Sequence, residues 1–104
     1  MARFDIYPNP IAQDRKDFPF VLEIQSDLLY RFTERVCVPL VREGFIPGLT
    51  DRFHPTLIVE GEALRLHPLG IAVFFIHELR NPLGSAKPDA MQIELALDML
   101  FRGY

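Results

Sequence analysis

The 104-residue sequence predicts a mainly β protein with one C-terminal α-helix, in which about five or six short strands curl into a small barrel-like sheet packed by the helix. Residues 18–25 alternate between apolar and other side chains with a period of two, which indicates a strand. Residues 71–76 form a continuous run of β-branched and aromatic side chains, and apolar residues recur at helical spacing over 90–101. Because no linker, repeat or low-complexity segment divides the chain, we expect one domain over residues 1–104.

The first half of the chain is predicted to hold three strands. They are expected at Arg3–Tyr7, 18–24 and 35–38, separated by a polar loop at 9–17 and by the break Gln25-Ser26-Asp27. Pro8 closes the first strand, and Pro39 is expected to end the third, because proline cannot donate to a strand ladder. The alternation at 18–24 favours a half-buried strand.

The second half adds a hairpin and a further strand. The expected elements are an irregular segment or short helical turn at 40–51, a hairpin of Thr56–Val59 and Ala63–Leu66 around Glu60-Gly61-Glu62, a strand at Ile71–Ile76 and a polar loop at 78–87. The unbroken apolar run at 71–76 favours a strand that is buried on both faces.

The last segment has the signals of an amphipathic helix. It is predicted to begin at Ser85 or Lys87, with Pro88 in the first turn and the negative charge of Asp89 near the helix N-terminus. One apolar stripe comprises Ala90, Ile93, Leu97, Leu100 and Phe101, and a second comprises Leu95, Ala96 and Met99. Since one stripe suffices to dock a helix on a sheet, the second predicts a contact with a partner subunit.

Charge and composition exclude several classes of protein. The net charge is −3, and the 11 basic residues are scattered, whereas a general nucleic-acid binder usually carries a basic face. A single cysteine, Cys37, allows no internal disulfide, and neither a signal-peptide pattern nor an apolar run long enough to span a bilayer is present. We therefore expect a soluble, cytoplasmic protein.

Catalytic and metal-binding patterns are absent from the sequence. His54, His67 and His77 are far apart and show no metal-ligand spacing, so each is expected to be a structural or surface residue. Cys37 lies among strand residues, where a buried, inert thiol is expected. No phosphate-binding loop or nucleophile elbow is present either, so we find no catalytic constellation and expect neither cofactor nor metal.

Several segments resemble the CcdB family of bacterial toxins in their order, spacing and total length. They are the first strand ending in Tyr7, Leu22-Glu23-Ile24-Gln25-Ser26-Asp27-Leu28-Leu29, Val36-Cys37-Val38-Pro39-Leu40, the approach to Pro55, and Ala96-Leu97-Asp98-Met99-Leu100-Phe101-Arg102-Gly103-Tyr104. The resemblance implies an SH3-like barrel that forms a homodimer through its helix-bearing face. It also implies a non-enzymatic toxin that binds the A subunit of DNA gyrase and traps gyrase on cleaved DNA. A cognate antitoxin would neutralise the toxin, and the pair would repress its own operon, so that contact with DNA is only indirect.

The resemblance also implies a gyrase-binding surface. Carried over position by position, it consists of Leu28, Leu29, Asp98, Phe101, Arg102, Gly103 and Tyr104. The family usually ends in Trp-Gly-Ile, whereas this chain ends in Arg102-Gly103-Tyr104, and Tyr104 is a candidate for the aromatic role two residues later. Packing in the core or under a loop for Leu28 and Leu29, a solvated helix position for Asp98 and a solvated tail for 102–104 remain alternatives.

Two other functions remain open for such a chain. A ribonuclease toxin on the same barrel, like MazF and PemK, would need a basic groove and a positioned acid–base pair. A homologue that binds the antitoxin but has lost its toxic end would be favoured by the unusual Arg102.

Overall fold

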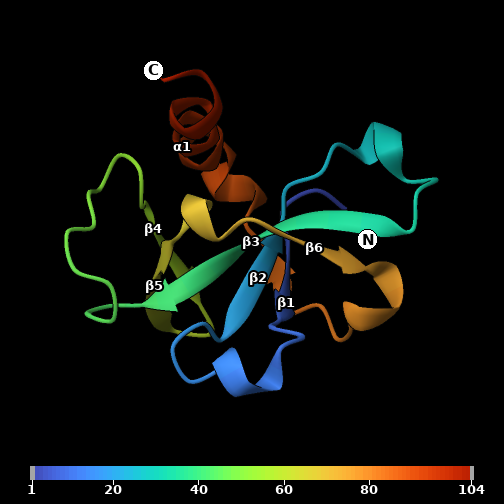
Figure 1. The fold of residues 1–104 in the computed structure, drawn as a ribbon, viewed down its shortest axis with the longest axis horizontal. Helices are drawn as coiled ribbons and strands as arrows, with labels where there is room; N and C mark the ends of the chain where they lie inside the picture. The colour runs from blue at the N-terminus through green and yellow to red at the C-terminus, as the bar shows by residue number, and fades with distance from the viewer. Residues whose placement is uncertain (1, 104) are drawn as a thin grey trace.

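The computed structural model describes residues 2–103 and contains one antiparallel sheet, five 3-10 turns and a C-terminal helix (Figure 1). The strands are β1 (Asp5–Pro8), β2 (Phe20–Glu23), β3 (Glu34–Arg42), β4 (Thr56–Val59), β5 (Glu62–Leu66), β6 (Ala72–Phe75) and β7 (Gly84–Ser85). Their order in the sheet is β4-β5-β3-β2-β1-β7, and β6 pairs with β3. The helix α1 spans Ala90–Arg102. The predicted class, mainly β with one C-terminal helix, is therefore confirmed, and the sheet forms a half-barrel.

Strand β3 is longer than the sequence predicts, because it continues through Pro39. Residues 34–37 of β3 pair with β6 and residues 40–42 pair with β5, so Pro39 lies where the partner strand changes. The Pro39 carbonyl accepts a hydrogen bond from the His67 N–H (3.0 Å). The proline nitrogen faces the same gap between β6 and β5, so its lack of an N–H interrupts the hydrogen bonds of neither strand pair. Gly70 of the turn η3 (Pro68–Gly70) lies against the ring, since a Cβ there would come within 2.6 Å of Pro39 Cγ.

The sheet has a buried cluster on each face. The larger cluster lies under α1 and joins Leu22, Val38, Leu40, Leu64 and Leu66 to Ile93, Ala96 and Leu97 of the helix. The opposite face carries a smaller cluster of Tyr7, Val21, Cys37, Phe74 and Leu79. Because of this second cluster, β2 is buried on both faces and not half-buried, as the alternating pattern predicts.

Strand β6, in contrast, is more exposed than the sequence predicts. Of its four residues only Phe74 is buried, whereas Val73 and Phe75 are exposed. Ile71 and Ile76, which flank the strand, are exposed as well. The apolar run at 71–76 therefore forms an edge strand with an apolar outer surface, which is a type of surface that other chains can cover.

The predicted hairpin and helix are confirmed with small shifts of their ends. β4 and β5 are joined by Glu60-Gly61, both with positive φ (51° and 79°), as a two-residue hairpin turn requires. A 3-10 turn with Pro88 in its first residues, η5 (Lys87–Asp89), leads into α1. Ala96 belongs to the buried face of α1 and not to the second stripe, and Phe101 is exposed. The outer stripe that remains consists of Met91, Leu95 and Met99 at i, i+4, i+8.

Candidate functional site: the end of helix α1 and the turn at 27–32

Four of the residues expected to bind the target lie together at the C-terminal end of α1. Phe101 is 66% exposed, and Asp98 is half-buried and pairs with exposed Arg102 (Nε–Oδ1 3.8 Å). Gly103 has φ 84° and donates its N–H to the Met99 carbonyl (3.3 Å), so it closes the helix in the left-handed conformation that glycine adopts most readily. The last helical turn therefore presents an aromatic ring and an Arg–Asp pair to solvent. Tyr104 lies outside the described residues.

The other two expected residues lie on the turn η2 (Asp27–Leu29), between β2 and β3. Ser26 caps this turn by accepting the Leu28 N–H (3.2 Å). Leu28 is 87% exposed and Leu29 44%, so the alternative of core packing for this pair is wrong. Both parts of the predicted site lie on the upper side of the molecule in Figure 1.

Arg3 joins the two parts of the site. Its backbone N–H donates to Asp27 Oδ1 (2.9 Å), and its side chain donates to the Ile24 carbonyl (3.0 Å) and to Glu94 Oε1 of α1 (3.0 Å). Arg3, Glu94, Leu97, Asp98 and Arg102 line a groove of about 370 Å³. The base of the Leu28–Leu29 turn is therefore tied to the face of α1 that carries Asp98.

Sequence reasoning missed two neighbours of the leucine pair. Tyr30 and Phe32 follow it in the same connection and are also largely exposed. Large aromatic side chains inside a short polar connection are the signal that could have identified them, since such residues are usually buried when they have no partner.

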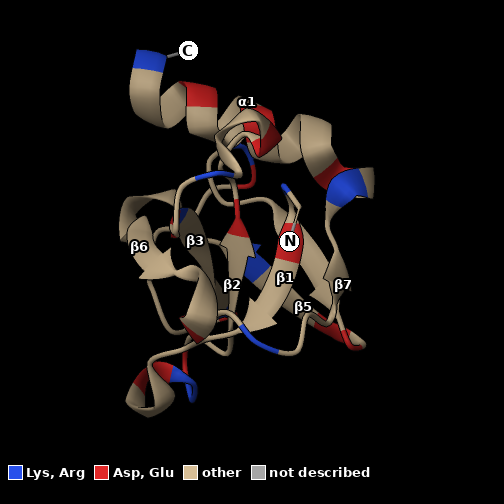
Figure 2. Cartoon of the chain, turned by 90° about the vertical axis from the view of Figure 1, so that its right-hand side faces the viewer, with Lys and Arg blue, Asp and Glu red and all other residues tan. Residues whose placement is uncertain are grey.

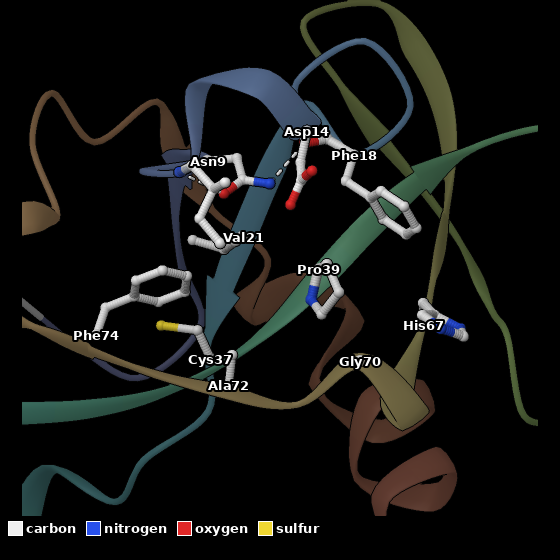
Figure 3. A pocket seen from close by; sticks show the side chains of 11 residues that line it. Asn9, Asp14, Phe18, Val21, Cys37, Pro39, His67, Gly70, Ala72 and Phe74 are labelled. Atoms are coloured by element: carbon white, nitrogen blue, oxygen red, sulfur yellow. Dashed lines mark hydrogen bonds between the residues drawn. The ribbon is translucent and has the colours of Figure 1, made fainter.

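A separate pocket of about 220 Å³ opens on the face of the sheet opposite α1 (Figure 3). Val21, Cys37, Pro39, Ala72 and Phe74 contribute apolar or sulfur atoms, and Asn9, Asp14 and His67 contribute polar groups. The Asn9 side chain fixes the loop at one side of the pocket, because it donates to the Phe18 carbonyl (2.9 Å) and accepts the Ile11 N–H (2.9 Å). No Lys or Arg is among the side chains that line this pocket, so it offers nothing to neutralise a phosphate.

Three groups near this pocket, His67, His54 and Cys37, have pKa values shifted toward their neutral forms. Burial lowers the pKa of His67, which stacks on His54 at 6.2 Å, and burial likewise lowers the pKa of His54. Burial raises the pKa of the Cys37 thiol to about 12. An uncharged imidazole carries no positive charge, and a protonated, fully buried thiol is not a nucleophile at neutral pH.

Charges elsewhere on the described residues are interspersed. Figure 2 shows Lys and Arg at separate places along the chain, among acidic residues. Within residues 2–103, no three His, Cys, Asp or Glu side chains form a group that could hold a metal ion. The same part of the chain contains no helix of the length and apolarity needed to cross a membrane.

Comparisons with known proteins bear on both the family and the fold. The family model described as CcdB protein matches residues 3–103. A search of curated proteins gives no significant match. Among solved structures, one described as an endoribonuclease in complex with its cognate antitoxin, from a mycobacterial species, superposes with a TM-score of 0.70 at 17% identity, over 95% of this chain and 92% of that one. At this identity the likeness concerns the fold, which is that of CcdB- and MazF-type toxins.

Proposed function

The chain belongs to the CcdB family, and from this premise we propose that it is a toxin that binds the A subunit of DNA gyrase and traps the gyrase complex with cleaved DNA. The observation that carries the proposal is the exposed end of α1, where Phe101 and Arg102 project beside the groove that Arg3 shares with the helix. An exposed aromatic ring on a helix end is a rigid anchor of the kind that dominates protein interfaces. In this proposal the toxin acts by binding alone and needs no catalytic residue.

The proposal is tested with gyrase, ATP and supercoiled plasmid. After denaturation and removal of protein, linear DNA should accumulate with the full chain and disappear when residues 102–104 are deleted. Phe101→Ala should weaken the effect at least tenfold if the ring is an anchor. Ile58→Ala, at an exposed apolar residue on β4 outside both proposed surfaces, is the control and should poison gyrase like the parent protein.

Two other results would contradict the proposal. If folded protein yields no linear DNA with active gyrase, and expression causes no growth arrest, the homologue that only binds antitoxin is the better description. If total RNA is degraded by protein free of contaminating nuclease, a ribonuclease is the better description. The cation-free lining of the pocket in Figure 3 argues against the second.

We further propose that two copies associate through the helix-bearing face. Met91, Leu95 and Met99 form an exposed stripe on α1, and the η3 turn next to the helix exposes Leu69. The outer surface of β6 adds Val73 and Phe75. An apolar area of this kind on a chain of this size favours a protein contact.

A cognate antitoxin is proposed as the second partner, because the family consists of toxins of toxin–antitoxin systems.

Leu95→Glu combined with Met99→Glu should convert the dimer to a monomer, because two carboxylates would be buried without partners in the interface. Sedimentation velocity measures the change, and circular dichroism verifies that the fold persists. Ile58→Glu, at an apolar position on β4 that is more exposed than Leu95 or Met99, is the control and should remain dimeric. A monomeric parent protein, or a dimer that survives both charges, would contradict this interface.

A further inference from the structure

The turn between β2 and β3 exposes more apolar surface than Leu28 and Leu29 account for. Tyr30 is 72% exposed and Phe32 60%, so four of the five residues at 28–32 present large apolar side chains to solvent. Exposed side chains of this size in one short turn are uncommon on a monomeric surface.

A buried ion pair gives this turn a fixed shape. Arg35 on β3 pairs with Glu23 on β2 (Nε–Oε2 3.6 Å), and the two side chains are 7% and 3% exposed. The same guanidinium donates to the backbone carbonyls of Tyr30 (3.0 Å) and Glu34 (3.0 Å), and also to that of Phe32. The guanidinium therefore lies under the turn and holds its backbone while the side chains point outward.

Further contacts hold the base of the turn on both sides. Gln25 accepts the Val36 N–H (3.0 Å) and donates to the Glu34 carbonyl (3.1 Å), so it joins the two strands where they separate. Ile76 donates its N–H to the Thr33 carbonyl (2.8 Å), which ties the turn to the end of β6. A turn whose ends are held in this way loses little conformational freedom on binding.

We infer that Tyr30 and Phe32 extend the surface formed by Leu28 and Leu29, and that residues 28–32 together are an apolar contact surface for the protein target of this toxin. The inference rests on the proposed function and adds two residues that the family pattern did not supply.

The chemistry of the turn favours a protein over other partners. Its only cation is Arg31, which is too little positive charge to hold a nucleic acid. Arg35 already occupies the carbonyls of Tyr30 and Phe32, so recognition depends on side chains more than on backbone pairing. Tyr, Phe and Arg are the residues enriched at the centres of protein interfaces. The surface is also continuous with Leu28 and Leu29, and Arg3 ties the start of this turn to Glu94 of α1.

The experiment compares the full chain with Tyr30→Ser, Phe32→Ser and the double variant in the gyrase cleavage assay. The concentration that gives half-maximal linear DNA should rise at least tenfold in the double variant. Ile58→Ser, at a residue 67% exposed on β4, is the matched control and should leave that concentration unchanged. Thermal unfolding should be unaffected in all four variants, because exposed substitutions rarely change stability appreciably.

Each alternative occupant has its own result. Poisoning at the parent concentration by the double variant overturns the inference while the proposed function stands. Loss of self-association in sedimentation, with poisoning retained by a tethered dimer, would assign the turn to a second copy instead. Loss of neutralisation by antitoxin with poisoning intact would assign it to the antitoxin. If the parent protein produces no linear DNA at all, the proposed function fails, and the inference fails with it.

Discussion

Arg35→Met should lower the free energy of unfolding by about 3–5 kcal/mol, because it leaves the carboxylate of Glu23 buried without its cation. Glu23 is 3% exposed, and its Oε1 already has no hydrogen-bond partner within residues 2–103. Burial raises the pKa of Glu23 even with Arg35 beside it, which indicates how costly that negative charge is in this position. The variant also removes the donor that the carbonyls of Tyr30 and Phe32 share. Urea unfolding followed by circular dichroism measures the loss.

Two further variants distinguish the cost of leaving a buried charge unpaired from the loss of an ion pair in general. Arg42 and Glu62 form a closer pair (2.8 Å), but both side chains are about 40% exposed, so Arg42→Met should cost only about 1 kcal/mol. Combining Glu23→Leu with Arg35→Met removes both charges and should recover part of the loss seen in the single variant. A loss below about 1 kcal/mol in Arg35→Met, or a double variant no more stable than the single one, would contradict this account.

The parts of the fold that depend on local signals were predictable from the sequence. The turn residues Glu60-Gly61 specify the β4–β5 hairpin, and Pro88 with the helical spacing that follows specifies α1. Two strands were interpreted wrongly because their surroundings are determined by distant segments. The pattern of β2 could not reveal that Phe74 and Leu79 cover its second face, and the run at 71–76 is apolar because of its outer surface and not because it is buried.

The site was predictable only in part, for a similar reason. Leu28, Leu29 and the end of α1 came from the resemblance to the family, and the structure adds that they are accessible. Arg3 bonds to Asp27 and to Glu94, which lie 24 and 91 positions further along the chain. No local sequence pattern encodes contacts over such separations. The support of the turn by Arg35 depends equally on the β2–β3 register, which sets Glu23 opposite Cys37 and so brings both members of the pair to one face.

The folded protein should lose up to about 4 kcal/mol of stability between pH 9 and pH 12 because of Cys37 alone. The thiol is fully buried beside Glu23, and burial raises its pKa from 9.0 to about 12. Between these values the unfolded chain has released a proton that the folded chain still holds, so a rise in pH favours unfolding, with a slope of about 1.4 kcal/mol per pH unit. Below pH 9 both states hold the proton, and Cys37 contributes no pH dependence there.

Cys37→Ala isolates the contribution of the thiol, because the difference between the two unfolding curves cancels every other titrating group. The variant should be less stable by about 1 kcal/mol at pH 7 through the small cavity it leaves, and its stability should fall less steeply above pH 9.

Burial also raises the pKa of Tyr7, which lies in the same cluster, so Tyr7→Phe should flatten the remaining slope above pH 10. Alkylation by iodoacetamide gives an independent readout, since the native thiol should react only after unfolding. Equal slopes for the parent and Cys37→Ala, together with rapid alkylation of the native protein, would mean that the cluster opposite α1 opens to solvent and that Cys37 is not enclosed in it.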